Sequence, residues 1–134
     1  MKTISEHARE AILALNLIPA EDVGIQSVLD SSWNGTPPRI LISEGENNIE
    51  ECQFGAVAQT TLLTIFGLSA DRDTAITLCR QAAKAAFARI ESLERKPGYG
   101  ILAITRDASR VGNIPDSTEF EAFRSFHVIN TINL

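Results

Sequence analysis

The stretch from Cys52 to Leu93 constrains the fold more than any other, because it changes from strand periodicity to helix periodicity. Its first part, CQFGAVAQTTLLTIFGLS, places β-branched and aromatic residues at alternate positions, a pattern that predicts a long β-strand. The half from Leu62 to Phe66 is apolar on both faces, which indicates a central strand. The second part is rich in alanine and predicts a long helix that ends before Pro97.

The predicted helix has a recognisable start and one apolar face. Ser69 or Asp71 is expected to cap it, and the acidic side chain of Asp73 suits the positive end of the helix dipole. Apolar residues recur at three- and four-residue steps, at Ile76, Cys79, Ala83, Ala86, Phe87 and Ile90. Because many of them are small, we expect this helix to lie close against a sheet.

The N-terminal third of the chain predicts a second helix and a short strand. Thr3 and Glu6 have the spacing of a capping box, so residues 4–17 are expected to form an amphipathic helix. Gly24 to Trp33 reads as a short strand, with a helix as the competing interpretation. After a loop with turn-forming residues, Arg39 to Ser43 predicts a short apolar strand.

Two hairpins are expected around the long helix. Glu44 to Glu51 reads as an acidic loop that joins the short apolar strand to the long strand. Beyond the helix, Tyr99 to Thr105 predicts a strand, Arg106 to Ser117 a polar loop and Glu119 to Leu134 a terminal strand. The order favours an α+β domain with two layers, in which both helices pack on an antiparallel sheet of about four to five strands.

Composition agrees with one ordinary globular domain spanning residues 1–134. The chain has 44% hydrophobic and 22% charged residues, and its net charge of -5 argues against a protein whose task is to grip nucleic acid. No apolar run reaches the roughly 20 residues of a membrane-spanning helix, and the N-terminus lacks the apolar region of a signal peptide. We therefore expect no membrane contact and a cytoplasmic location. Cys52 and Cys79 are interpreted as reduced thiols.

No pattern in the sequence predicts catalysis. The chain lacks a GxSxG elbow, an HExxH motif, a phosphate-binding loop and a dinucleotide fingerprint. His7 and His127 are interpreted as lone surface histidines, and the acidic segment lacks the spacing of a calcium loop. We expect no enzyme, no cofactor and no metal site, although a pocket assembled from distant residues stays open.

The length of the predicted long strand points to an assembly. About 15 residues at ~3.3 Å each span roughly 50 Å, more than the core of so small a domain covers. Part of the hairpin should therefore project, and an exposed strand edge suits subunit contacts. Interface residues are expected on the acidic segment, the projecting strand and the following polar loop: Glu44, Glu46, Glu50, Glu51, Gln53, Gln59, Arg106 and Arg110.

The order and texture of the chain resemble the tail-terminator, or tail-completion, proteins of long-tailed phages and prophages. The segments that carry the resemblance are REAILALNL, PPRILISEGE, DTAITLCRQAAKAAFARI, YGILAIT and FRSFHVINTI, which together cover most of the chain. That family has no invariant motif, so the resemblance is one of layout.

The resemblance implies a mechanical function. Six copies would close into a ring that ends growth of the tail tube and offers a surface to the head-completion protein, while DNA passes through without being gripped. Such a protein would act in the host cytoplasm during assembly and then reside in the virion tail. Another virion connector, a secretion-system part or a small ligand-binding domain or enzyme is the alternative.

Overall fold

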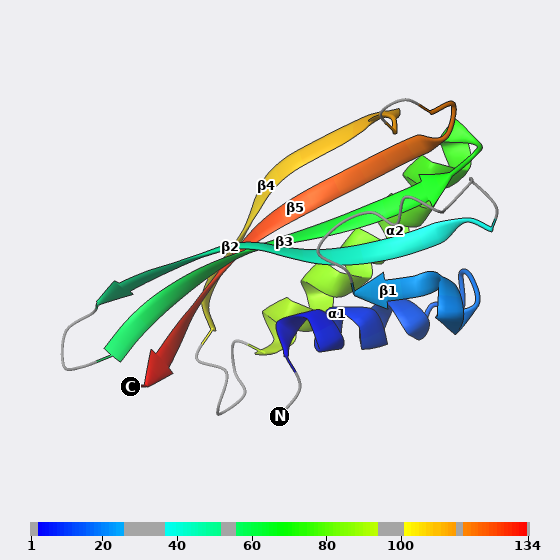
Figure 1. The fold of residues 1–134 in the computed structure, drawn as a ribbon. Coiled ribbons are helices and arrows are strands. Elements are labelled where there is room, and N and C mark those ends of the chain that lie inside the picture. Colours follow the sequence, from blue (N-terminus) through cyan, green and yellow to red (C-terminus); the bar gives the residue numbers. More distant parts are fainter. Residues whose placement is uncertain (1–2, 26–36, 52–55, 94–100, 115–116, 134) are drawn as a thin grey trace.

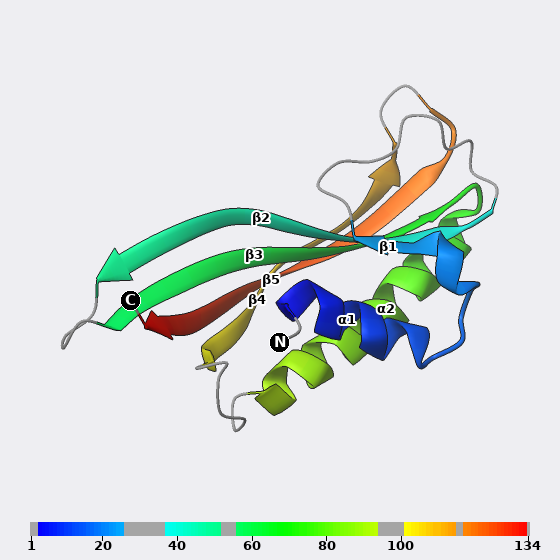
Figure 2. The ribbon, with the colours of Figure 1, turned by 60° about the horizontal axis from the view of Figure 1, so that its bottom comes forward.

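The computed structural model describes residues 3–25, 37–51, 56–93, 101–114 and 117–133. Its elements in chain order are α1 (Ile4–Leu13), the 3-10 turn η1 (Ala20–Asp22), β1 (Val23–Ile25), β2 (Arg39–Glu51), β3 (Ala56–Ser69), α2 (Arg72–Ser92), β4 (Ile101–Asn113) and β5 (Phe120–Asn133). The strands form one five-stranded sheet in the order β1-β2-β3-β5-β4. Both helices cover the same face of this sheet (Figures 1 and 2).

The expected two-layer α+β architecture is therefore confirmed, with one correction. β1 runs parallel to β2 through the pairs Val23↔Ile40 and Ile25↔Ile42, so the sheet is mixed and not purely antiparallel. Parallel neighbours cannot be joined by a tight hairpin, so the chain has to cross back along the sheet between Ile25 and Arg39. Most of that connection lies outside the described residues. The other three neighbouring pairs are antiparallel.

Both helices begin at the residues that the capping patterns predict. Thr3 accepts a hydrogen bond from the amide of Glu6 at 3.1 Å, and Asp71 accepts from the amide and the hydroxyl of Thr74 at 3.0 and 2.7 Å. The first helix ends at Leu13, four residues before the expected end. The left-handed backbone of Asn16, with φ of 53°, is incompatible with continuing the helix there.

Two predicted loops are wrong, because the chain continues as strand. Glu44 to Glu51 belongs to β2, which pairs with β3 from Arg39↔Leu68 to Glu51↔Val57. Arg106 to Asn113 belongs to β4, which pairs with β5. The polar side chains of these two segments leave no alternating apolar pattern in the sequence. Each segment nevertheless forms backbone hydrogen bonds with a long neighbouring strand. The connection between β2 and β3, with Cys52 and Gln53, lies outside the described residues.

The core lies between the sheet and the helices. Its largest fully buried side chains come from both helices and from the central strands: Ile12, Ile40, Ile42, Leu63, Ile65, Leu68, Ile90, Leu93 and Val128. Small residues on α2, including Ala82, Ala83 and Ala86, are buried against it. At Gly67 of β3 the approach is so close that an added Cβ would lie 2.4 Å from the carbonyl oxygen of Ala75.

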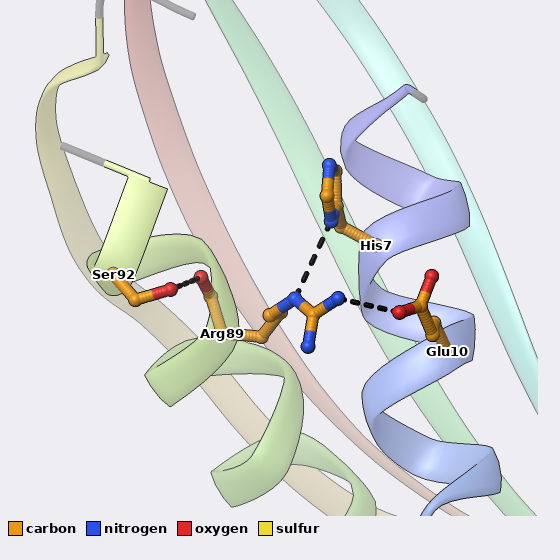
Figure 3. Close-up of polar contacts among 4 residues, drawn as sticks. All are labelled: His7, Glu10, Arg89 and Ser92. Atoms are coloured by element: carbon orange, nitrogen blue, oxygen red, sulfur yellow. Dashed lines mark hydrogen bonds and ion pairs between the residues drawn. The ribbon is translucent and has the colours of Figure 1, made fainter. Parts of the chain in front are cut away.

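The two helices are joined by polar contacts that the sequence does not reveal (Figure 3). Arg89 of α2 donates from Nη2 to Glu10 of α1 at 2.6 Å and from Nε to Nδ1 of His7 at 3.4 Å. His7 is buried, with 7% of its surface exposed, so the interpretation as a surface histidine is wrong. Both partners of Arg89 lie one helical turn apart on the same face of α1.

Part of the sheet extends beyond the helices. The 21 residues of α2 span about 31 Å, whereas the 14 residues of β3 span about 46 Å. In both ribbon views the C-terminal ends of β2 and β5 and the N-terminal end of β3 reach past α1 and α2 (Figures 1 and 2). We call this three-stranded extension, formed by residues 50–51, 56–58 and 131–133, the arm.

Irregular steps interrupt the pairing of β2 with β3 and of β4 with β5. Three residue steps on β2, from Glu44 to Asn47, face two steps on β3. On β4, the steps from Ile101 to Ala103 and from Arg106 to Ser109 also contain one extra residue each relative to β5. Such β-bulges bend a strand and increase its twist. The bulge between Ile101 and Ala103, which faces Asn130 and Ile129 of β5, thus lies next to the base of the arm.

Candidate functional site

A groove of about 520 Å³ lies on the helical side of the sheet, where α2 passes over β5 and the edge strand β4. Its lining from α2 consists of Arg80, Ala83, Lys84, Phe87, Ala88 and Glu91. Its lining from the sheet consists of Arg106, Ala108 and Ser109 of β4 and of Arg124, Ser125 and Phe126 of β5. We call this the α2–β4 groove.

Two phenyl rings form the apolar part of the groove. The ring centroids of Phe87 and Phe126 lie 5.3 Å apart at an interplanar angle of 56°, a favourable tilted arrangement. Above them, the guanidinium carbon of Arg106 lies 5.0 Å from the centroid of Phe87. This cation–π contact holds the side chain of Arg106 across the groove from α2.

The groove is strongly basic although the protein is acidic. Arg80, Lys84, Arg106 and Arg124 line it, against the single carboxylate of Glu91, whereas the whole chain has a net charge of -5. Within the described parts of the chain, no carboxylate forms an ion pair with any of these four cations. The groove thus presents unneutralised positive charge beside an aromatic floor.

The cysteine near the groove is chemically quiet. Cys79 is 2% exposed, and its Sγ donates to the carbonyl oxygen of Ile65 at 3.5 Å. Burial raises the pKa of this thiol to about 11, with the nearby charge of Arg124 acting in the opposite direction. Because the thiolate is the nucleophilic form, Cys79 is unsuited to covalent catalysis near neutral pH.

The described residues offer no metal centre, since no three His, Cys, Asp or Glu side chains among them gather in a way that would hold an ion. Neither described helix combines the length and apolar character needed to cross a membrane. The four cationic side chains of the groove make it chemically suited to binding an anion.

The predicted interface residues are distributed over three strands. Arg106 lies in the groove, and Arg110 lies farther along β4, exposed. Burial raises the pKa of Glu121, on the neighbouring strand, while the charge of Arg110 lowers it. Glu44 is exposed and accepts a hydrogen bond from the hydroxyl of Ser5. The structure therefore separates the acidic and basic candidates.

The remaining candidates belong to β2 and β3 or lie outside the described residues. Gln59 is half-buried in β3, between Ile49 and Asn130 of the neighbouring strands. Glu46, Glu50 and Glu51 belong to β2, and their side chains are outside the described part of the structure. Gln53 also lies outside it.

Sequence reasoning missed the helical half of the groove. Arg80 and Lys84 are separated by four residues and both are exposed on one side of α2, a spacing that places two like charges side by side. That spacing is visible in the sequence, but a charged helix face is usually only solvated. In the structure the two cations line a groove together with β4, and the sequence predicts a loop for the part of β4 from Arg106 onward.

Comparison with known proteins identifies a fold and no family. No protein-family model matches the chain, and no curated protein matches it in sequence. Among solved structures, the chain is similar to a chain in the virion of a native gene transfer agent (GTA) particle, with a TM-score of 0.51 and 10% identity. The match covers 92% of this chain and 94% of that one. At this identity it shows a shared fold, and the shared fold extends over nearly the full length of both chains.

Proposed function

We propose that this protein is a structural component of a phage or phage-like particle. The observation that carries the proposal is the match to a virion chain over nearly the whole length of both proteins. A match of this extent concerns the fold of the chain as a whole and not one motif within it. The arm, which a monomer has no evident use for, agrees with a protein that works in an assembly (Figure 1).

Within this class, we propose the role of a tail terminator. Six copies close into a ring at the head-proximal end of the tail tube, stop its growth and offer a surface to the head-completion protein. Cyclic closure joins two different surfaces of neighbouring copies, and this chain has two such surfaces: the arm and the α2–β4 groove. The ring forms in the host cytoplasm and remains in the virion tail.

The proposed role is mechanical and needs no catalytic residue. Its partners are other copies of the chain, the tail tube protein and the head-completion protein. DNA passes through the ring, and an overall net charge of -5 suits passage without tight binding. An adaptor elsewhere in a virion or in a secretion system has the same fold requirements and differs only in its partner.

A second candidate function is the binding of a small anion, and the α2–β4 groove is the observation that favours it. Its volume of about 520 Å³ lies within the range of small-molecule sites. Thermal unfolding with and without inorganic phosphate, citrate or a nucleotide tests this candidate. A rise in Tm that grows with ligand concentration supports it, and an unchanged Tm with all three ligands argues against it.

Tube length is the property that tests the proposed function. The tail tube protein of the same particle is allowed to polymerise with increasing amounts of this chain, and tube lengths are measured in negative-stain images. A terminator shortens the tubes and is found at one end of each. An unrelated folded acidic protein at the same concentration serves as the control. Unchanged tube lengths, with no density at the tube ends, would contradict the proposal.

A further inference from the structure

We infer that the α2–β4 groove is the docking site for the acidic outer half of β2, residues 44–51, from a neighbouring copy of this chain. The inference rests on the proposed function, since it supplies the contact between successive copies in the ring. It pairs a concave surface lined by four cations with the most acidic segment of the sequence.

The groove carries a cluster of positive charge. Arg80, Lys84, Arg106 and Arg124 lie around one cavity without a described ion-pair partner. These four are a third of the 12 Lys and Arg residues of a chain that is acidic overall. Like charges gathered around one concave surface repel each other, and an anionic partner relieves that repulsion.

The acidic part of β2 lies away from the groove of its own chain. In the sheet order β1-β2-β3-β5-β4, two strands separate β2 from β4. At the usual spacing between neighbouring strands, β2 and β4 are about 14 Å apart. The groove lies at the β4 edge of the sheet, so a segment of β2 meets it only when that segment comes from another copy.

The outer half of β2 lies at an edge of the described sheet. β1 pairs with β2 only at Ile40, Leu41 and Ile42, so beyond Ile42 the described strands leave β2 with β3 as its single neighbour. This outer half contains four glutamates within eight residues, Glu44, Glu46, Glu50 and Glu51. It continues into the arm, which reaches past the helices (Figure 2), and so it is placed to contact a neighbouring copy.

The proposed contact fits cyclic symmetry. The groove and the outer half of β2 are different surfaces, so each copy offers both and the contact is heterologous. Repeating one heterologous contact generates a closed ring when the rotation between copies closes. Charge complementarity also sets the register, because only one stretch of the sequence carries so many carboxylates.

Lysine–carboxylate crosslinking tests this contact directly. A carbodiimide joins a Lys amine to a carboxylate that touches it, and Lys84 is the lysine of the groove. A mixture of 14N- and 15N-labelled full-length chains distinguishes bonds between copies from bonds within one copy. We expect mixed-isotope peptides that link Lys84 to Glu46, Glu50 or Glu51. Lys2 and Lys96 serve as internal reference amines.

Charge reversal provides the energetic test. Reversing Lys84 and Arg106 to Glu is expected to raise the concentration at which the chain assembles by at least about tenfold. Reversing Glu50 and Glu51 to Lys should have a similar effect, and combining all four changes in one chain should recover assembly. Arg72→Glu is the matched control, because Arg72 is exposed at the start of α2 and does not line the groove.

The outcomes separate the two proposals. Oligomers without Lys84–β2 crosslinks, and unaffected by reversal of Lys84 and Arg106, would overturn the docking contact and leave the ring intact. Open chains or dimers with these crosslinks would support the contact and contradict the closed ring. Oligomers that respond to inorganic phosphate but not to reversal of Glu50 and Glu51 would assign the groove to a small anion and overturn the inference.

Discussion

Replacing Gly67 by alanine is predicted to destabilise the fold strongly, because α2 lies directly against the backbone of β3 at this residue. The added Cβ would lie 2.4 Å from the carbonyl oxygen of Ala75 and 2.7 Å from the amide nitrogen of Cys79. Both atoms belong to the backbone of α2, so no side-chain rotation relieves the clash. An ordinary contact near 3.4 Å requires the helix to move from the sheet by about 1 Å.

The size of the effect follows from the packing. Overpacking a dense core costs about 1–3 kcal/mol, and a clash with two backbone atoms places Gly67→Ala near 3 kcal/mol. With a urea m-value of roughly 1.5 kcal/mol/M, the unfolding midpoint falls by about 2 M. Because α2 carries Arg80 and Lys84, the same shift would also disturb the α2–β4 groove.

The assay is urea unfolding followed by far-UV circular dichroism, and the chain offers a matched control. Gly112 also lies in a strand, but a Cβ added there has no atom within 4 Å. Gly112→Ala should change the free energy of unfolding by no more than about 0.5 kcal/mol. Equal midpoints for the two variants would refute the close contact between α2 and β3.

Three further predictions concern the core, the helix cap and the helix pair. In a variant with Cys52 replaced by Ser, Cys79 should resist alkylation at neutral pH, and rapid labelling of the folded protein would contradict this. Because the pKa of Cys79 is raised to about 11, its contribution to stability is present below the ordinary thiol pKa and is lost as pH rises through about 11. Asp71→Ala should lower the urea midpoint, and equal midpoints at neutral pH would show that Asp71 does not stabilise the helix as a cap. Because hydrogen bonds from Thr74 lower the pKa of this carboxyl, the difference in midpoint between the two proteins should decrease as acid protonates Asp71. Glu10→Gln should cost less than about 1 kcal/mol in the same assay, because the ion pair with Arg89 is partly exposed.

The sequence predicts the elements whose packing leaves a periodic pattern. The strand around Leu62 to Phe66, the capped helix from Asp71 and the terminal strand all have apolar residues at strand or helix spacing, and all are present. The caps can be predicted because a carboxylate or hydroxyl just before a helix accepts a hydrogen bond from a free backbone amide of the first turn. These elements suffice for the α+β class.

The errors fall where polar residues form regular structure. Glu44 to Glu51 and Arg106 to Asn113 look like loops because their side chains are charged or small, yet both are strands. Backbone pairing with long neighbouring strands decides their conformation, and side-chain periodicity does not report it. The parallel direction of β1 is likewise a matter of chain path and leaves no local pattern.

The groove could not be predicted from the sequence, because it requires β4 to be a strand. Arg106 was predicted as an interface residue on a loop, whereas it lies on β4 over the ring of Phe87. The basic groove arises only when β4 is a strand beside α2, so Arg80 and Lys84 had no predicted partner. The sequence does not predict the burial of His7, because its partner on α2, Arg89, is far away in the sequence.

Native mass spectrometry of the full-length chain over a wide concentration range, with negative-stain images of the same samples, tests the central claim most directly. The proposed function predicts hexamers that appear as closed rings with a central hole, either alone or after addition of the tail tube protein. Monomers at every concentration, both alone and with tube protein present, would contradict it.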